Sequence, residues 1–318
     1  MQLSSRRAAG IVFTLAGAIL WGFSGATIQY LLSTQLISPL IITLVRMIGA
    51  GILFLIIGRF LQPGSIGALL ASKRDIATCA VFGIAGLFFN QISYATTVGL
   101  TNSGTATVLA SLSIIIVMLV SCAQFRKLPR VQDVVGLVFA LLATFLIATK
   151  GDVHSLAIPH EGLIMGFINA ITVAIYVMYP RKLMNTYGSI TTAGFGMLFG
   201  ACAAVISAGS IHILEASGTA CMPSITQLAH IPPLRADIMI GLFIVTVIGT
   251  VGAFGMYLHG ISIIGGVQGT LLGAAEPPSA TIFPAIFLGT IFTWADWLGL
   301  IFMLITVVLV ALPNKKQT

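Results

Sequence analysis

Residues 76–98 read IATCAVFGIAGLFFNQISYATTV, a run without a single charged side chain. A helix of about 20 mostly apolar residues crosses the roughly 30 Å hydrocarbon core of a bilayer. Strands of a membrane β-barrel instead alternate apolar and polar residues over about ten positions, and this continuously apolar run does not. The stretch therefore predicts a membrane-spanning helix.

Comparable runs fill the rest of the chain, in which 58% of the 318 residues are hydrophobic and 7% are charged. A soluble domain carries about 25% charged residues, so the fold class that we expect is an all-α integral membrane protein. The first run is longer than the apolar core of about 7–15 residues in a signal peptide and is expected to remain as a span. Ten spans are predicted: 11–32, 39–58, 76–98, 102–125, 132–149, 161–181, 190–212, 237–259, 266–290 and 293–312.

The basic residues lie on alternate connections between these spans. With the N-terminus inside, the outer side receives Lys150 and Arg235, while Arg46 lies within a span. The inner side receives Arg6, Arg7, Arg59, Lys73, Arg74, Arg126, Lys127, Arg130, Arg181, Lys182, Lys315 and Lys316. Such a bias orients membrane proteins, so both termini are predicted to be cytoplasmic. It also accounts for the net charge of +7 without a nucleic-acid partner.

The second half of the chain repeats the first. Moving residues 83–149 forward by 163 positions places Gly86 on Gly249, Tyr94 on Tyr257 and Asp133 on Asp296. The first two spans of each half match more loosely, and the best offset places Trp21 on Val173. We predict one repeat in 1–150 and a second in 151–318.

The number of spans in each repeat sets the architecture. Five spans are an odd number, so the second copy must enter the membrane from the opposite side. Inverted repeats are typical of secondary transporters, whose substrate site lies near the midplane between the halves. The pattern therefore indicates a carrier of a small solute.

Two charged residues fall deep inside predicted spans. Glu276 lies in the ninth span, just before Pro277, and an intramembrane carboxylate marks a functional site by default. It is the candidate for proton coupling, with a structural hydrogen bond between helices as the alternative. Arg46, in the second span, is a candidate anchor for an anionic group, with an outward-reaching structural arginine as the alternative.

The remaining candidates for substrate binding are polar or aromatic side chains within spans. Tyr94 and Tyr257 occupy matching repeat positions and are candidate gates, although tyrosine is also enriched at membrane interfaces. The others are Trp21, Asn90, Ser111, Tyr176 and Gln268. No paired cysteine spacing indicates a metal site, and no cofactor is expected. The expected partners are a substrate and lipid, with the protein a monomer or homodimer.

Several short motifs occur in order along the spans: Trp21-Gly22, Leu44-Val45-Arg46, Tyr94 to Ala106, Glu276-Pro277 and Trp297 to Leu312. Together they resemble the drug/metabolite transporter superfamily in its EamA branch. The resemblance covers nearly the whole chain and implies a transporter, often an exporter, of amino acids and other small metabolites. The chain departs from this pattern at Ser113-Ile114, where a proline is common, which puts in doubt the kink that the resemblance implies in the fourth span.

The alternative to a transporter is a non-transporting membrane protein, such as a receptor or an intramembrane enzyme. Gly22-Phe23-Ser24-Gly25 matches the Gly-x-Ser-Gly of rhomboid proteases, with His259 as the base. Such a dyad needs serine and histidine within hydrogen-bond reach. The predicted spans place Ser24 well inside the membrane and His259 at its cytoplasmic edge, so no enzyme is expected.

Overall fold

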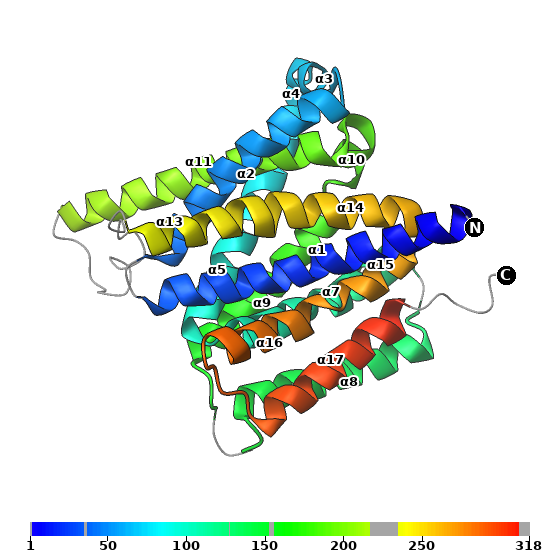
Figure 1. Ribbon diagram of the computed structural model, residues 1–318, viewed down its shortest axis with the longest axis vertical. Helices are drawn as coiled ribbons and strands as arrows, with labels where there is room; N and C mark the ends of the chain where they lie inside the picture. Colours follow the sequence, from blue (N-terminus) through cyan, green and yellow to red (C-terminus); the bar gives the residue numbers. More distant parts are fainter. Residues whose placement is uncertain (1, 35–36, 127, 153–155, 217–234, 312–318) are drawn as a thin grey trace.

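The computed structural model describes residues 2–34, 37–126, 128–152, 156–216 and 235–311, and these are helical with no strand (Figure 1). The first half contains α1 (Gln2–Ser33), α2 (Pro39–Leu61), α3 (Ser65–Ala71), α4 (Lys73–Val81), the π-helix η1 (Phe82–Phe88), α5 (Phe89–Leu100), α6 (Ser103–Ser111), α7 (Ser113–Phe125) and α8 (Val131–Thr149). The second half contains α9 (His160–Met178), α10 (Arg181–Tyr187), α11 (Ser189–Ala216), α13 (Ala236–Phe243), the π-helix η3 (Ile244–Gly252), α14 (Ala253–Ile264), α15 (Gly266–Gly273), α16 (Glu276–Phe287) and α17 (Trp294–Ala311).

The membrane class predicted from the sequence is confirmed, but not the count of ten spans. Within the described residues, nine helical stretches are long and apolar enough to cross a membrane. They match nine of the predicted spans within a few residues. The exception is the predicted span 266–290, which consists of two short helices, α15 and α16, separated at Ala274 and Ala275.

Two prolines explain this interruption. Pro277 and Pro278 lie in the first turn of α16, where a missing N–H costs nothing because first-turn amides have no partner within the helix. They also cannot donate back to the carbonyls of Gly273 and Ala274, so the hydrogen-bond ladder of α15 cannot continue through them. The sequence therefore ends one helix and begins the next at the same point.

A weaker interruption divides α6 from α7, although no proline is present. Leu112 donates to the carbonyl of Leu109 at 3.1 Å, and Ile115 donates to Leu112 at 3.0 Å. These three-residue bonds tighten the helix locally. Where the Ser113-Ile114 sequence left a kink in doubt, the structure has this tightened turn at Leu112.

The elements of the two halves recur at a constant spacing. The helices α6, α7 and α8 begin at Ser103, Ser113 and Val131; α15, α16 and α17 begin at Gly266, Glu276 and Trp294, an offset of 163 residues in each case. The π-helices η1 and η3 also fall at corresponding places, each within the third long helix of its half. The repeated sequence is therefore accompanied by repeated local structure, including the irregular turns.

Contacts made by α1 recur in α9 in the same way. A Cβ on Gly10 would lie 2.7 Å from Ile264, and one on Gly162 would lie 3.1 Å from Thr101. Gly162 corresponds to Gly10 at an offset of 152 residues, and Ile264 corresponds to Thr101 at the offset of 163 residues. The two contacts are therefore equivalent in the two repeats. The shift of 152 is the one that places Trp21 on Val173.

Four pairs of long helices build the bundle. The helix α2 packs along α11 and α8 along α17, while α1 packs on α14 and α5 on α9. Figure 1 shows α8 and α17 side by side at the lower edge, and α1 begins at the same end of the bundle where α17 finishes.

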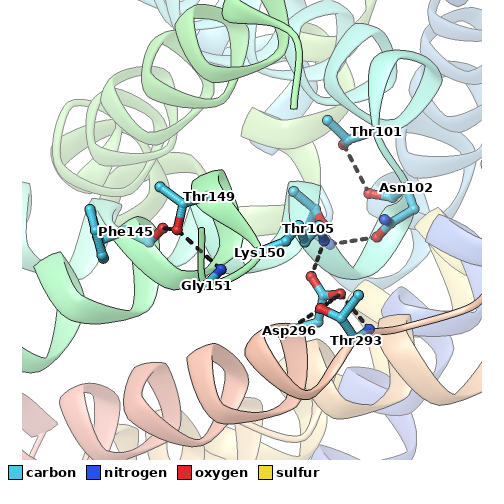
Figure 2. A network of polar contacts seen from close by, with 9 residues as sticks. All are labelled: Thr101, Asn102, Thr105, Phe145, Thr149, Lys150, Gly151, Thr293 and Asp296. Carbon is cyan, nitrogen blue, oxygen red and sulfur yellow. Dashed lines mark hydrogen bonds and ion pairs between the residues drawn. The ribbon is translucent and has the colours of Figure 1, made fainter. Parts of the chain in front are cut away.

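The α8–α17 pair is antiparallel and is joined at both ends. Lys150, directly after α8, forms an ion pair with Asp296 in the first turn of α17 (Figure 2). At the opposite end, Arg130 binds Asp133 at 2.7 Å and also donates to the carbonyl of Val310 at 2.9 Å. Both aspartates also accept from an amide at the start of their helix, which stabilises a helix N-terminus. These bonds make α8 and α17 a single unit.

Candidate functional site

Glu276 is the first residue of α16 and lies at the break between α15 and α16. A carboxylate at a helix N-terminus is stabilised by the helix dipole and by the free amides of the first turn. The prolines at the next two positions remove two of these amides. The carboxylate is half-buried and has no hydrogen bond or ion pair with any residue in the described part of the chain. It is therefore available to bind a proton or a cationic group.

Arg46 projects from α2 and is held by side chains from two other helices. Its Nε donates to Thr250 Oγ1 in η3 at 2.6 Å, and its Nη1 donates to Gln91 Oε1 in α5 at 2.7 Å. A guanidinium has five N–H donors, so three of them have no partner among the described residues. Arg46 neither reaches outward nor caps a helix, as the structural alternative required. It is a fixed cation with unused donors.

The π-helix η3 provides one of these two partners. The hydroxyl of Thr250 donates to the carbonyl of Val245, five residues earlier, at 2.8 Å. Its oxygen is therefore left to accept from Arg46. A π-bulge shifts side chains out of the regular α-helical register and often occurs at a functional site. The irregular backbone of η3 thus places Thr250 Oγ1 within hydrogen-bond distance of Arg46.

Glu276 and Arg46 interact electrostatically without forming an ion pair. The carboxylate lies within electrostatic range of the guanidinium and of the hydroxyls of Tyr94, Tyr176 and Tyr257. No nitrogen of Arg46 comes within 4 Å of a Glu276 oxygen among the described contacts. Two opposite charges therefore face a common region while each keeps unused hydrogen-bonding capacity.

Tyr94 and Tyr257 each bind the short helix that follows them. The hydroxyl of Tyr94 is 3.0 Å from Thr107 Oγ1 in α6, and that of Tyr257 donates to the carbonyl of Gly269 in α15 at 3.2 Å. Both hydroxyls therefore point into the bundle, as the gate hypothesis requires.

Trp21 and Gly22 bring α1 against this region. The ring of Trp21 contacts that of Tyr257, with centroids 4.7 Å apart. A Cβ on Gly22 would lie 2.5 Å from Ser279 Cβ and 2.9 Å from the carbonyl oxygen of Glu276. Only glycine allows α1 to approach the first turn of α16 this closely.

Three sequence candidates are not joined to Glu276 by any described contact. Ser111 donates to the carbonyl of Thr107 in its own helix at 2.9 Å. Asn90 contributes its backbone carbonyl, which accepts from Asn169 Nδ2 at 2.8 Å. Gln268 is half-buried in α15. Of the two residues that position Arg46, Thr250 was not among the candidates. Gln91 carries the same sequence signal as the candidates, a polar side chain inside an apolar span.

The proposed serine–histidine dyad does not assemble. Ser24 Oγ is buried and has no hydrogen-bond partner within the described structure. The ring of His259 instead packs edge-on against Phe13, 5.0 Å away between centroids. Phe13 precedes Ser24 by 11 residues, or about 16 Å along α1 at 1.5 Å per residue. The base is therefore far from the serine.

Comparisons with known proteins agree with this architecture. The chain is 29% identical over 308 residues to YicL, an uncharacterized inner membrane transporter of Salmonella typhimurium, covering 97% of each chain. It is 24% identical over 184 residues to an uncharacterized transporter of Archaeoglobus fulgidus, covering 57% of this chain and 60% of the other. A protein of known crystal structure shares the fold, with a TM-score of 0.59 at 18% identity over 95% and 96% of the two chains.

The model of the EamA-like transporter family matches residues 8–149 and 160–312, which together make up nearly the entire chain. This match agrees with the resemblance carried by the short sequence motifs. It points to a multi-pass membrane transporter rather than to an enzyme. The chain therefore belongs to the EamA-like transporter family.

Proposed function

We propose that this protein is a secondary transporter that exports a small organic metabolite, an amino acid or a related compound, across the cytoplasmic membrane. The observation that carries the proposal is the pair of opposite charges near the helix break. Among the described residues, Glu276 has no hydrogen-bond partner, and three donors of Arg46 in α2 are unused. Discontinuous helices of this kind form the midplane substrate sites of many transporters.

The two charges favour a substrate that carries both signs. A carboxylate accepts the free N–H groups of Arg46 in a bidentate arrangement, while an ammonium group binds the Glu276 carboxylate. The rings of Trp21 and Tyr257, which contact each other beside Glu276, offer an apolar surface to the rest of the molecule. In this proposal the half-buried Tyr94 and Tyr176 also line the site.

The architecture that we propose is two inverted repeats, 1–150 and 151–318, with α15 and α16 together making a tenth crossing. Contacts between α8 and α17 support a two-fold axis in the membrane plane. Thr306 donates to the carbonyl of Gly136 at 3.0 Å, and a Cβ on Gly299 would lie 3.1 Å from the carbonyl of Ala143. At the offset of 163 residues, Gly136 corresponds to Gly299 and Ala143 corresponds to Thr306. The offset therefore converts each contact into the other. Two antiparallel helices exchange contacts in this way when the axis is perpendicular to both.

Coupling to protons runs through Glu276 in this proposal. Gain or loss of a proton switches the site between neutral and charged, and inside a membrane this difference biases which face is open. Glu276→Gln retains the shape and abolishes the titration. We expect the mutant to bind and exchange substrate but to lose accumulation driven by a pH gradient, measured in proteoliposomes with a panel of amino acids.

A matched control is Glu161→Gln, which makes the same change at an exposed carboxylate in the first turn of α9 and is expected to leave gradient-driven transport near the wild-type rate. Full gradient-driven accumulation by Glu276→Gln would leave Glu276 as a packing residue. Absence of transport by the wild-type protein with every compound and gradient would argue for the receptor alternative.

A further inference from the structure

The two ends of the bundle are packed differently around equivalent helices. The helix α6 packs on α1 of its own repeat and on α16 and α17 of the second repeat. Its counterpart α15 packs on α1, α14 and α17, and no comparable packing with α7, α8 or α9 is found in the described part of the chain. The helices α9, α7 and α8 are the counterparts of α1, α16 and α17. Within the described residues, α15 therefore lacks packing comparable to that which α6 makes with these three helices.

Side chains at corresponding positions of α6 and α15 also differ in how far they are exposed. Val108 and Leu109 in α6 are 2% and 0% exposed, whereas Leu271 and Leu272, at the corresponding positions of α15, are half-buried. All four side chains are apolar and of similar size, so their chemistry does not account for the difference. Side chains therefore pack more tightly at the α6 end of the bundle, named here the closed end, than at the α15 end, named here the open end.

A single glutamine joins three segments at the closed end. Gln29 in α1 donates from Nε2 to Thr290 Oγ1, between α16 and α17, at 2.8 Å. Its Oε1 accepts from the amide and the hydroxyl of Ser103, the first residue of α6, at 2.9 and 3.1 Å. We name the contacts of Gln29, Ser103 and Thr290 the outer latch. Nearby, Asn102 caps α6, and the Lys150–Asp296 ion pair joins α8 to α17 (Figure 2).

No equivalent of the latch is found at the open end among the described residues; Lys127, which corresponds to Thr290 at the offset of 163, lies outside them. The residue that corresponds to Gln29 at the offset of 152 is Arg181, which is exposed and donates to the carbonyl of Val177, in the preceding helix α9, at 3.4 Å. The residue that corresponds to Ser103 is Gly266, which has no side chain to accept or donate. Within the described residues, the three-way polar connection is therefore found at one end of the bundle alone.

We propose that the structure is the state open toward the end where α1 begins, and that the outer latch is the contact that must break before the closed end, at α6, opens. This inference rests on the proposed transport function. Gln29 does not contact Glu276 in any described interaction, so it acts by positioning α6 against α1 and the segment before α17. Loss of the latch shifts the population toward the oppositely open state, because it removes bonds made in one state alone.

Accessibility to a membrane-impermeant maleimide tests this proposal without any substrate. In a background lacking the native cysteines, Thr107→Cys reports on the closed end, where Thr107 is 2% exposed. Leu271→Cys reports on the open end. With native Gln29, we expect slow labelling at 107 from outside the cell and rapid labelling at 271 in inside-out vesicles. Gln29→Leu should raise the labelling rate at 107 about tenfold and lower the labelling rate at 271. The variant destabilises the state in which the α6 end is closed, because it removes hydrogen bonds that are made in that state alone.

Gln62→Leu is the matched control. Gln62 Oε1 also accepts from the amide and the hydroxyl of one residue, Thr191, at 3.1 and 2.9 Å, but it joins α11 to the end of α2. It should leave the rate at 107 unchanged. Thr290→Val removes a single bond of the latch and should give a smaller increase than Gln29→Leu, which also guards against misfolding of that variant.

An unchanged rate at 107 in both Gln29→Leu and Thr290→Val would overturn the latch, as would an equal increase in Gln62→Leu. Increases at both 107 and 271 would indicate general loosening and would also overturn it. Because labelling needs no substrate, these outcomes are separate from a failure of the wild-type protein to transport any compound.

Discussion

Pro284, at the residue scale, lies inside α16 and has no N–H to donate to the carbonyl of Ala280 four residues earlier. The hydroxyl of Ser103 in α6 donates to that carbonyl at 2.8 Å. A backbone group left without its bond by a proline in one repeat is thus satisfied by a serine from the other. In a bilayer this matters because no water is present to bind the free carbonyl.

This arrangement predicts an interaction between the two positions. Ser103→Ala leaves the carbonyl of Ala280 unsatisfied, and we expect a loss of about 1 kcal/mol in the free energy of unfolding. Pro284→Ala supplies an amide to the same carbonyl, so the double mutant should recover much of that loss. Thermal unfolding of the four proteins in detergent measures the coupling. Simple additivity of the two single mutants would contradict this account.

Glycines at the element scale set how closely the helices approach. A Cβ on Gly249 in η3 would lie 2.3 Å from Ser24 Cβ in α1. Its counterpart Gly86 in η1 meets Tyr176 in α9, where a Cβ would lie 3.2 Å away. Small residues at such crossings allow backbones to pack in a membrane, where van der Waals contact rather than water drives association. The sequence repeat showed Gly86 and Gly249 as equivalent, but not what they contact.

We predict opposite effects for two alanine substitutions in this one continuous helical run. Gly249→Ala should lower the free energy of unfolding by about 1–3 kcal/mol, because the added methyl overlaps Ser24 and forces α1 away. Gly255→Ala, where a Cβ would meet nothing within 4 Å, should be neutral or stabilising by up to about 1 kcal/mol through helix propensity. Thermal unfolding compares them, and equal destabilisation by both would exclude close packing as the cause.

At the scale of the whole molecule, the helix order and the charge bias together predict the orientation. The chain begins at the same end of the bundle where α17 finishes (Figure 1), which agrees with an even number of crossings. Lys182, in α10, belongs to the strongly basic side, which faces the cytoplasm under the positive-inside bias. Cys221, outside the described residues, lies in a connection predicted to face outward.

Cysteine labelling in intact cells tests this orientation. With the other native cysteines replaced, Cys221 should react with an impermeant maleimide added outside. Lys182→Cys, in a protein without other cysteines, should react only after the membrane is permeabilised. The reverse pattern, with position 182 labelled in intact cells, would show that the protein is inserted the other way.

The sequence by itself determined the membrane class, nine of the ten predicted spans and the repeat offset of 163 residues. These follow from hydropathy, proline and charge, which act on neighbouring residues. It did not determine that span 266–290 is two helices, although Pro277 and Pro278 were visible, because prolines at that depth either kink or end a helix depending on their surroundings.

The tertiary structure alone decided which polar groups meet. Arg46 binds Gln91 and Thr250, which are 45 and 204 residues away in the chain, and Gln29 binds Ser103 and Thr290 at the closed end. Such contacts depend on the rotation and crossing of each helix, which a uniformly apolar pattern does not specify. The difference between the two ends of the bundle has the same origin. Two repeats of similar sequence pack differently, because closing one end around α6 leaves α15 without the same neighbours.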